Sequence, residues 1–246
     1  MDQDSMAGGG YTRAPPPMPC DRSQPSAIAA PAGLLKLIRC RVAAADRAAF
    51  AAGQQVWRGL REVAGFRGQT GGWSLNDPDL ALILGFWRDA EAHQAFLGRE
   101  HDVLYARSGQ QPIIRELTTD RFRRLEGTGG SRPIENQAGR GGGFLRVIEI
   151  HLLPGRLEHL VAAQHAVWTP ALEAAGGLAG GLWHHLDDPL RVLALSLWPS
   201  REAEAGWKTG PFFEAWRRAG VEDDCETVTG HLVPVEEDWR VDWPRP

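Results

Sequence analysis

Two nine-residue stretches decide the fold: 34–42, LLKLIRCRV, and 144–152, FLRVIEIHL. In the first, apolar residues alternate with Arg39 and Arg41, a pattern typical of a strand with one buried face. The second stretch has the same alternation and places Glu149 where the first has Arg39. The two stretches therefore indicate equivalent strands of a repeated unit.

Outside these strands, a shift of 111 residues continues the correspondence. It superimposes four pairs of aromatic residues: Trp57 and Trp168, Trp87 and Trp198, Phe96 and Trp207, Tyr105 and Trp216. The two strands themselves need a shift of 110, so we expect a one-residue change near Pro154 and Gly155. The pattern predicts two tandem repeats, 34–125 and 144–235, the second of them diverged.

Periodicity gives the order of elements within each repeat. In the first repeat it predicts strands at 34–42, 66–75, 79–87 and 113–123, an amphipathic helix at 46–64, and a second helix from Asp89 through Tyr105 that stops at Ser108 and Gly109. The order is βαββαβ, the ferredoxin-like arrangement. In the second repeat, Pro170 and the pair Gly210-Pro211 should each interrupt a helix, because an interior proline breaks helical hydrogen bonding.

The remaining segments are poor in large apolar residues. Residues 1–33 contain six prolines and predict a flexible N-terminal tail, while 126–143 contain seven glycines and predict a linker. Residues 236–246 form a short C-terminal tail in which Trp239 and Trp243 are candidates to pack back on the body.

A four-stranded sheet with both helices on one face leaves its other face bare. Two such repeats cover each other's bare faces when they pack sheet to sheet, as two chains do in a symmetric dimer. We therefore predict an α+β fold in which two tandem ferredoxin-like repeats form an intrachain, pseudo-dimeric α/β barrel with a hollow between the sheets. Its inner face should carry Leu35, Leu37, Leu145 and Val147, with the opposite charges of Arg39 and Glu149 at equivalent positions.

Composition excludes several classes of protein. The 246 residues are 43% hydrophobic and 24% charged, as in soluble globular proteins. A net charge of -4 argues against nucleic acid as a partner, and no apolar run is long enough for a membrane helix or a signal peptide. The three cysteines show no metal-ligand spacing. We expect a cytoplasmic protein with a small-molecule ligand, no membrane partner and no metal, either a monomer as pseudo-dimer or a homodimer.

Several motifs of the first repeat together resemble a known group. They are Phe66-Arg-Gly-Gln-Thr-Gly-Gly-Trp73, Leu84-Gly-Phe-Trp87, Phe96, Glu100-His101-Asp102 and Ser108-Gly109-Gln110. This set resembles the uncharacterised YdbC-like bacterial family, a branch of the antibiotic-biosynthesis-monooxygenase-like dimeric α/β barrels. The resemblance covers 34–125 directly and 144–235 through the repeat. It implies a barrel cavity that in different members holds aromatic polyketides, haem or small metabolites, and it assigns no reaction.

The candidate catalytic residues are His101, Asp102 and Tyr105. His101 and Tyr105 are four residues apart and share a helix face, whereas Asp102 points about 100° away. His101 would accept a proton or ligate a haem near the end of the helix, with a pKa sensitive to Asp102 and to the C-terminal dipole. The alternative is a partly exposed histidine in a capping network.

The candidate ligand-binding residues are Gln69, Trp73, Trp57, Arg39 and Glu149. Gln69 and Trp73 flank a glycine pair that permits either close approach of a ligand or an ordinary bulge. Trp57 could line a pocket for a flat ligand or simply belong to the core. Adjacent His184 and His185 should point to opposite faces of a strand and make a poor metal pair.

These features support one leading hypothesis and two alternatives. The leading hypothesis is a cofactor-independent monooxygenase or related oxidoreductase acting on an aromatic or flat metabolite, with proton transfer by His101 and orientation by Trp73 and Gln69. The first alternative is a non-catalytic binding or stress-associated module whose barrel is filled by side chains. The second is a haem-binding protein with His101 as axial ligand.

Overall fold

The computed structural model describes residues 33–125, Thr128, Ile134 and 143–242. The expected N-terminal tail, most of the expected linker and Trp243 lie outside these residues. Both repeats belong to one unit of the chain, Pro31–Pro246.

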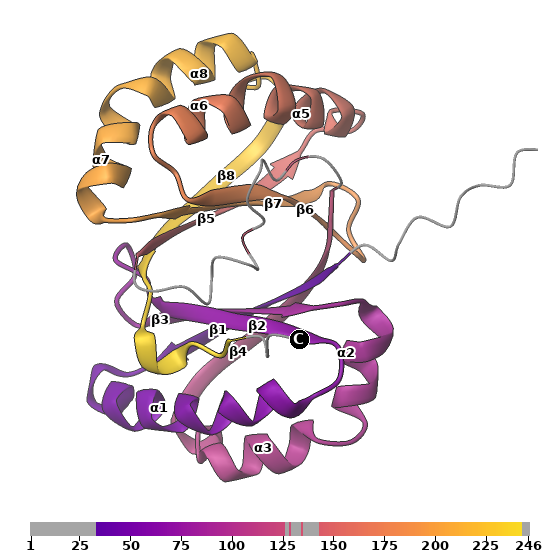
Figure 1. Ribbon diagram of the computed structural model, residues 1–246, viewed down its shortest axis with the longest axis vertical. Helices are drawn as coiled ribbons and strands as arrows, with labels where there is room; N and C mark the ends of the chain where they lie inside the picture. The colour runs from indigo at the N-terminus through magenta and orange to yellow at the C-terminus, as the bar shows by residue number, and fades with distance from the viewer. Residues whose placement is uncertain (1–32, 126–127, 129–133, 135–142, 243–246) are drawn as a thin grey trace, which may run out of the picture. The chain divides into compact units, whose positions relative to one another are not determined.

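Each repeat has the predicted βαββαβ order (Figure 1). Repeat 1 consists of β1 (Leu34–Val42), α1 (Arg47–Gln54) with a following 3-10 helix (Gln55–Glu62), β2 (Phe66–Trp73), β3 (Leu80–Trp87), α2 (Ala90–Leu97), α3 (His101–Ser108) and β4 (Ile114–Arg124). Repeat 2 consists of β5 (Phe144–Leu152), α5 (Leu157–Ala163), a π-helical turn (Gln164–Trp168), α6 (Thr169–Ala174), β6 (Ala179–His185), β7 (Arg191–Trp198), α7 (Arg201–Thr209), α8 (Pro211–Ala219) and β8 (Cys225–Pro234). Short 3-10 helices cover Ala44–Asp46, Gln111–Ile113 and Glu237–Trp239.

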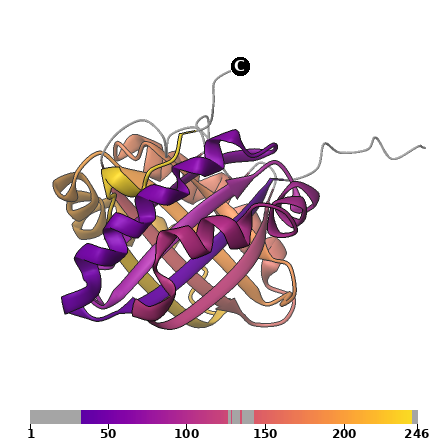
Figure 2. The same cartoon turned by 90° about the horizontal axis from the view of Figure 1, so that it is seen from below.

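The strands form one antiparallel eight-stranded sheet in the order β2-β3-β1-β4-β6-β7-β5-β8, which is the same four-strand order twice. The repeats join where β4 pairs with β6, from Phe122 opposite His185 to Arg124 opposite Trp183. At the opposite edges, the Leu75 amide donates to the Leu232 carbonyl at 2.8 Å. The helices of repeat 1 lie in front of its strands in Figure 2. The sheet thus curls into the predicted pseudo-dimeric barrel.

The space between the two sheet halves is packed. Leu35, Leu37, Leu145 and Val147 all have no exposed surface and belong to one cluster with large side chains of β3 and β7. These four inner-face predictions are confirmed, because strand alternation sends every second side chain to the same face. The expected hollow at this place is wrong, since the cluster fills it.

Arg39 and Glu149 contact each other across the barrel. The Arg39 guanidinium donates to both carboxylate oxygens of Glu149, at 3.0 Å from Nε, and to Asp120 at 2.6 Å. Arg191 donates to both oxygens of Asp120, at 3.1 and 2.9 Å, and to Glu149 at 3.3 Å. The ring of His185 completes the cluster through Asp120 at 3.0 Å. The opposite charges noted in the sequence therefore form an ion-pair network that ties the repeats together.

The second helix of repeat 1 differs from the prediction. It is capped by Asp89, whose carboxylate accepts from the Ala92 amide at 2.7 Å, as predicted. It ends at Leu97, however, because the Phe96 carbonyl accepts from the amides of Arg99 and Glu100 and closes the helix. A new helix, α3, then begins at His101. His101 thus lies at the start of a helix, and the expected influence of a C-terminal dipole on it is wrong.

Repeat 2 has the same break between α7 and α8, where Gly210-Pro211 predicted it. Its first helix is interrupted by the π-helical turn before Pro170, also as predicted. Phe50 and Leu160 are equivalent buried residues that lie 110 positions apart in the sequence. Trp57 and Trp168, which each line the pocket of their own repeat, lie 111 positions apart. The one-residue change therefore lies in the π-helical turn, where the wider helix absorbs an extra residue, rather than near Pro154.

Candidate functional site

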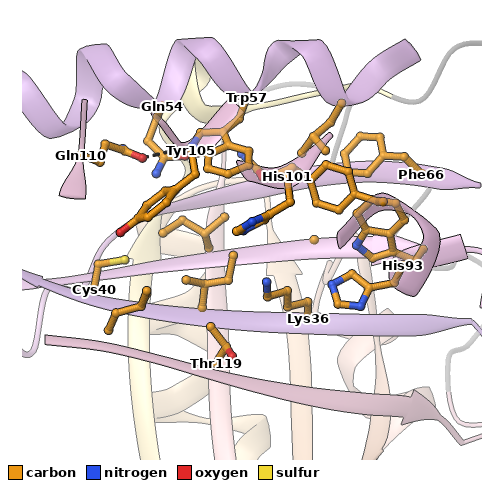
Figure 3. A pocket seen from close by; sticks show the side chains of 18 of the residues that line it. Lys36, Cys40, Gln54, Trp57, Phe66, His93, His101, Tyr105, Gln110 and Thr119 are labelled. Carbon is orange, nitrogen blue, oxygen red and sulfur yellow. Dashed lines mark hydrogen bonds between the residues drawn. The ribbon is translucent and has the colours of Figure 1, made fainter. Parts of the chain in front are cut away.

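A pocket lies between the sheet of repeat 1 and the helices that cover it, on the opposite side of the sheet from the filled barrel interior (Figure 3). Its volume is about 80 Å³. Much of the wall is apolar or aromatic, and the polar side chains that reach it are Lys36, Cys40, Gln54, Gln69, His93, His101, Tyr105, Gln110 and Thr119. Among the described residues that line it, none is an aspartate or a glutamate.

Strand β1 brings Lys36 and Cys40 into the pocket by the same alternation that sends Leu35 and Leu37 to the core. Lys36 stands opposite Gly85 of β3, which has no side chain to cover it. Figure 3 shows the Lys36 side chain rising from its strand into the pocket. Burial, opposed by the charge of Lys36, raises the pKa of the Cys40 thiol to about 12, so Cys40 is a buried thiol and not a thiolate.

His101 and Tyr105 meet as predicted. Their rings stack with centroids 5.9 Å apart and an angle of 24° between planes, and the Trp57 ring lies 5.9 Å from that of His101. The Nδ1 atom of His101 lies 2.9 Å from the Asp102 carboxylate, which can only accept a hydrogen bond. In a neutral His101 the proton therefore sits on Nδ1, and Nε2 is left as a proton acceptor. Asp102 itself is almost fully exposed and does not line the pocket.

Two buried polar atoms on the pocket wall have no hydrogen-bond partner among the described residues: Gln54 Oε1 and His93 Nε2. Gln54 is 4% exposed and His93 is 2% exposed. Burial, together with the charges of Lys36 and Arg121, lowers the pKa of His93 to about 4, so the ring is neutral near pH 7. Because buried polar groups are nearly always satisfied, these atoms point to a polar ligand or to water in the pocket.

Sequence reasoning missed Lys36, Gln54 and His93. The available signal was that Lys36 is one of two lysines in the chain and occupies the helix-facing side of a predicted strand. The sequence could not show that the described residues of the pocket wall include no carboxylate to pair with Lys36.

The structure separates the predicted ligand-binding residues. Trp57 and Gln69 line the pocket, although the Gln69 amide also donates to the Trp239 carbonyl at 3.0 Å. Trp73 lies in a different cluster with Phe50 and Trp239. Arg39 and Glu149 lie between the sheets and do not join His101.

The glycine pair beside Trp73 has a third role. A side chain on Gly71 would collide with the backbone of β3, and one on Gly72 with the Pro234 carbonyl of β8. The register shift in β2 lies between Phe66 and Gly68 instead. The pair therefore allows close approach of backbone, and the expected bulge at this point is wrong.

Gln110 fixes one wall of the pocket. It accepts a hydrogen bond from the Trp57 indole at 3.0 Å and donates to the Phe50 carbonyl at 2.9 Å. A Cβ on Gly53 would lie 2.5 Å from Cγ of Gln110 and 2.6 Å from the Ser108 carbonyl oxygen. The absence of a side chain at position 53 therefore lets Gln110 hold Trp57.

We expect Gly53→Ala to destabilise the protein by about 1–3 kcal/mol, since overpacking outweighs the better helix propensity of alanine. Thermal unfolding measures this. Gly206→Ala in α7 is the matched control, because nothing lies within 4 Å of a Cβ there. That change should stabilise by up to about 1 kcal/mol. Equal melting temperatures for the two variants would contradict the close packing at Gly53.

Repeat 2 has a pocket in the equivalent place, with a volume of about 160 Å³. Phe212 and Trp216 stand where repeat 1 has His101 and Tyr105, so the proton acceptor is missing. Its cation, Arg146, donates to Glu204 at 2.8 Å. Gln164 takes the place of Gln54. The two pockets therefore share a framework and differ in chemistry.

Comparison with known proteins supports the fold and the family. A proposed monooxygenase from Lactobacillus acidophilus NCFM matches with a TM-score of 0.66 and 12% identity, over 86% of this chain and 96% of that one. An anthrone oxidase-like protein matches with a TM-score of 0.56 and 15% identity, over 83% and 91% of the two chains. At these identities the likeness shows the fold alone.

The matches found by sequence have a higher identity than these structural matches but cover a smaller part of the chain. A family described only as a domain of unknown function, DUF4937, matches residues 34–122. The uncharacterized protein YdbC of Bacillus subtilis (strain 168) is 37% identical over 83 residues, which are 33% of this chain and 70% of YdbC. Because the match covers more than two thirds of YdbC at this identity, this protein belongs to the YdbC family.

Proposed function

We propose that the pocket of repeat 1 binds a small aromatic compound, removes a proton from it and exposes the resulting anion to dioxygen, as a monooxygenase-like oxidoreductase that needs no bound cofactor. The observation that carries this proposal is the ring of His101 beside aromatic walls, with its Nδ1 atom 2.9 Å from the Asp102 carboxylate, which leaves Nε2 free to accept a proton in the neutral ring. The fold shared with a proposed monooxygenase and an anthrone oxidase-like protein agrees with this proposal without assigning the reaction.

In this reaction His101 takes a proton from an acidic O–H or activated C–H group of the ligand. Asp102 holds the tautomer through Nδ1, and the rings of Trp57 and Tyr105 orient a flat ligand and exclude water. The electron-rich anion then reduces dioxygen. For a quinol, two electrons and two protons pass to dioxygen, so quinol and O₂ give quinone and H₂O₂. For an activated methylene group, CH₂ and O₂ give C=O and H₂O, so one oxygen atom enters the ligand and the other leaves as water. Gln69 completes the wall, whereas Trp73, Arg39 and Glu149 have no place in this mechanism.

The test is oxygen uptake with quinols and other one-ring oxidisable aromatic compounds, using variants that repeat 2 itself suggests. His101→Phe copies Phe212 and keeps an aromatic ring while removing the proton acceptor. We expect it to lower turnover by about 10²-fold or more, the usual contribution of a positioned base. His165→Phe, at an exposed histidine, should leave turnover unchanged. Equal turnover in wild-type protein and His101→Phe would reject this mechanism.

The non-catalytic binding module is the second candidate, and the filled space between the sheets favours it. It differs from the first candidate in one measurable respect: the ligand would shift the protein's fluorescence without any oxygen uptake. Detection of both signals together would exclude it.

Haem is the third candidate, and the residues fit it poorly. The pocket volume of about 80 Å³ has room for roughly five to eight water molecules, far less than a macrocycle needs. The ring of His101 is also packed against Trp57, Phe96 and Tyr105. We expect added haemin to give no shifted Soret band, and a band that His101→Phe removes would restore this candidate.

Location and assembly stay predictions. Among the described residues, no helix has the length and apolar character to cross a membrane. We propose a cytoplasmic protein that takes a small molecule and acts as a single-chain pseudo-dimer or as a homodimer of such chains, and light scattering at several concentrations separates these two states.

A further inference from the structure

The duplication provides an internal comparison for Lys36. At the shift of 110 that relates β1 to β5, Lys36 corresponds to Arg146. Both side chains line the pocket of their own repeat. Arg146 donates to the Glu204 carboxylate at 2.8 Å, and Glu204 is only 5% exposed. Repeat 2 therefore neutralises its pocket cation internally.

His93 occupies the position of Glu204 in repeat 1. Each is the fourth residue of a helix with the same N-terminal cap: Asp89 accepts from the Ala92 amide, and Ser200 accepts from the Ala203 amide. The carboxylate of repeat 2 is thus replaced by a neutral ring whose Nε2 has no partner among the described residues.

Lys36 is left without a counter-ion. It makes no hydrogen bond or ion pair with any other residue that the structure describes, and no carboxylate stands among the described residues of the pocket wall. Burial, and then the charge of Arg121, lowers the pKa of Lys36. A half-buried ammonium without a partner is unfavourable, and an anion that reaches it relieves this cost.

We propose that the ligand supplies the missing charge: the pocket of repeat 1 takes a small aromatic anion whose carboxylate or phenolate oxygen pairs with the ammonium of Lys36. This inference rests on the proposed function, because it names the ligand class of the same pocket. The volume of about 80 Å³ limits the buried part of the ligand to about one ring. In the proposed reaction, Lys36 would also stabilise the anion that forms when His101 removes a proton.

The chain offers a direct probe, because Lys36 and the exposed Lys208 are its only lysines. Reductive methylation with ¹³C-formaldehyde gives one NMR signal for each lysine and one for the α-amino group, and leaves all three nitrogens able to bind a proton. Benzoate should move the Lys36 signal, raise the pH at which it titrates and leave the Lys208 signal in place. Benzamide, a neutral isostere, should bind at least about tenfold more weakly. A parallel titration with 4-nitrophenolate distinguishes a phenolate ligand from a carboxylate.

Three variants complete the test. His93→Glu restores the ion pair that repeat 2 has, and Lys36→Met removes the cation. Both should abolish the preference for benzoate over benzamide. His93→Gln, which adds no charge, should keep it. Circular dichroism checks the fold of each variant, and if His93→Glu does not fold, Lys36→Met still decides the matter.

The outcomes separate the two proposals. Equal affinity of wild-type protein for benzoate and benzamide, with a stationary Lys36 signal, would overturn the anionic ligand and leave the oxidation standing. Selective binding of benzoate that depends on Lys36, without oxygen uptake from any quinol, would support the anionic ligand and overturn the oxidation.

Discussion

Trp239→Ala is expected to destabilise the protein by about 3–5 kcal/mol, the usual cost of truncating a buried aromatic side chain. Trp239 is 1% exposed and packs edge-on against Phe50 and Trp73, with ring centroids 5.5 and 5.3 Å away. It follows repeat 2 in the chain but belongs to a cluster of repeat 1. The variant therefore loses both a core side chain and the attachment of the C-terminal segment to the first repeat.

Urea unfolding followed by circular dichroism measures this loss. Phe213→Ala is the matched control, because Phe213 is 60% exposed and its truncation should change the free energy of unfolding by no more than about 0.5 kcal/mol. Trp239→Ala should also weaken ligand binding, since the Trp239 carbonyl accepts from the side chain of Gln69 on the pocket wall. Two variants of equal stability would show that the C-terminal segment does not pack as described.

Local patterns predicted the elements and the sheet-to-sheet packing. Alternation of period two is a property of the strand itself, so 34–42 and 144–152 revealed both the strands and their inner faces. The cap at Asp89 and the breaker Gly210-Pro211 also act locally, and both are found where they were predicted. The break after Leu97 was missed because no proline marks it in repeat 1.

The site was harder to predict, because it depends on which residues meet across the fold. His101, Tyr105 and Trp57 come together as expected, since helix periodicity and the repeat both constrain them. Trp73 does not join them, because the C-terminal segment supplies Trp239 as its partner from far along the chain. Lys36 corresponds to Arg146 at a shift of 110, and His93 corresponds to Glu204 at a shift of 111. The extra residue of the π-helical turn causes this difference, so no single shift shows both pairs.

Asp120→Asn is expected to destabilise the protein by about 2–3 kcal/mol at pH 7. Removal of one partner from a fully buried ion pair costs about 3–5 kcal/mol, and the partial exposure of this network reduces that figure. The carboxylate of Asp120 accepts from Arg39, His185 and Arg191. Its loss leaves two guanidinium groups that share only the carboxylate of Glu149. Asp102→Asn is the control, because that carboxylate is 96% exposed.

The effect of Asp120→Asn should also depend on pH. Burial by itself would raise the pKa of Asp120, but the hydrogen bonds from Arg191, His185 and Arg39 outweigh it and hold this pKa well below its ordinary value. A carboxyl group whose pKa is lower in the folded state stabilises that state above its unfolded pKa of about 3.9, and this stabilisation disappears as the pH falls through the folded pKa. The gap in unfolding free energy between wild type and Asp120→Asn should therefore be constant near neutrality and shrink below about pH 4.

The ring of His185 links Asp120 to the turn after β6. Its Nδ1 accepts from the amides of Asp187 and Asp188 at 3.1 and 2.9 Å, which leaves the proton on Nε2 to donate to Asp120. The network draws residues from β1 and β4 of one repeat and from β5, β6 and β7 of the other. Neutralising Asp120 should therefore loosen the contact between repeats before either repeat unfolds alone. A gap in unfolding free energy between Asp120→Asn and wild type that is the same at pH 3 as at pH 7 would contradict this role for Asp120.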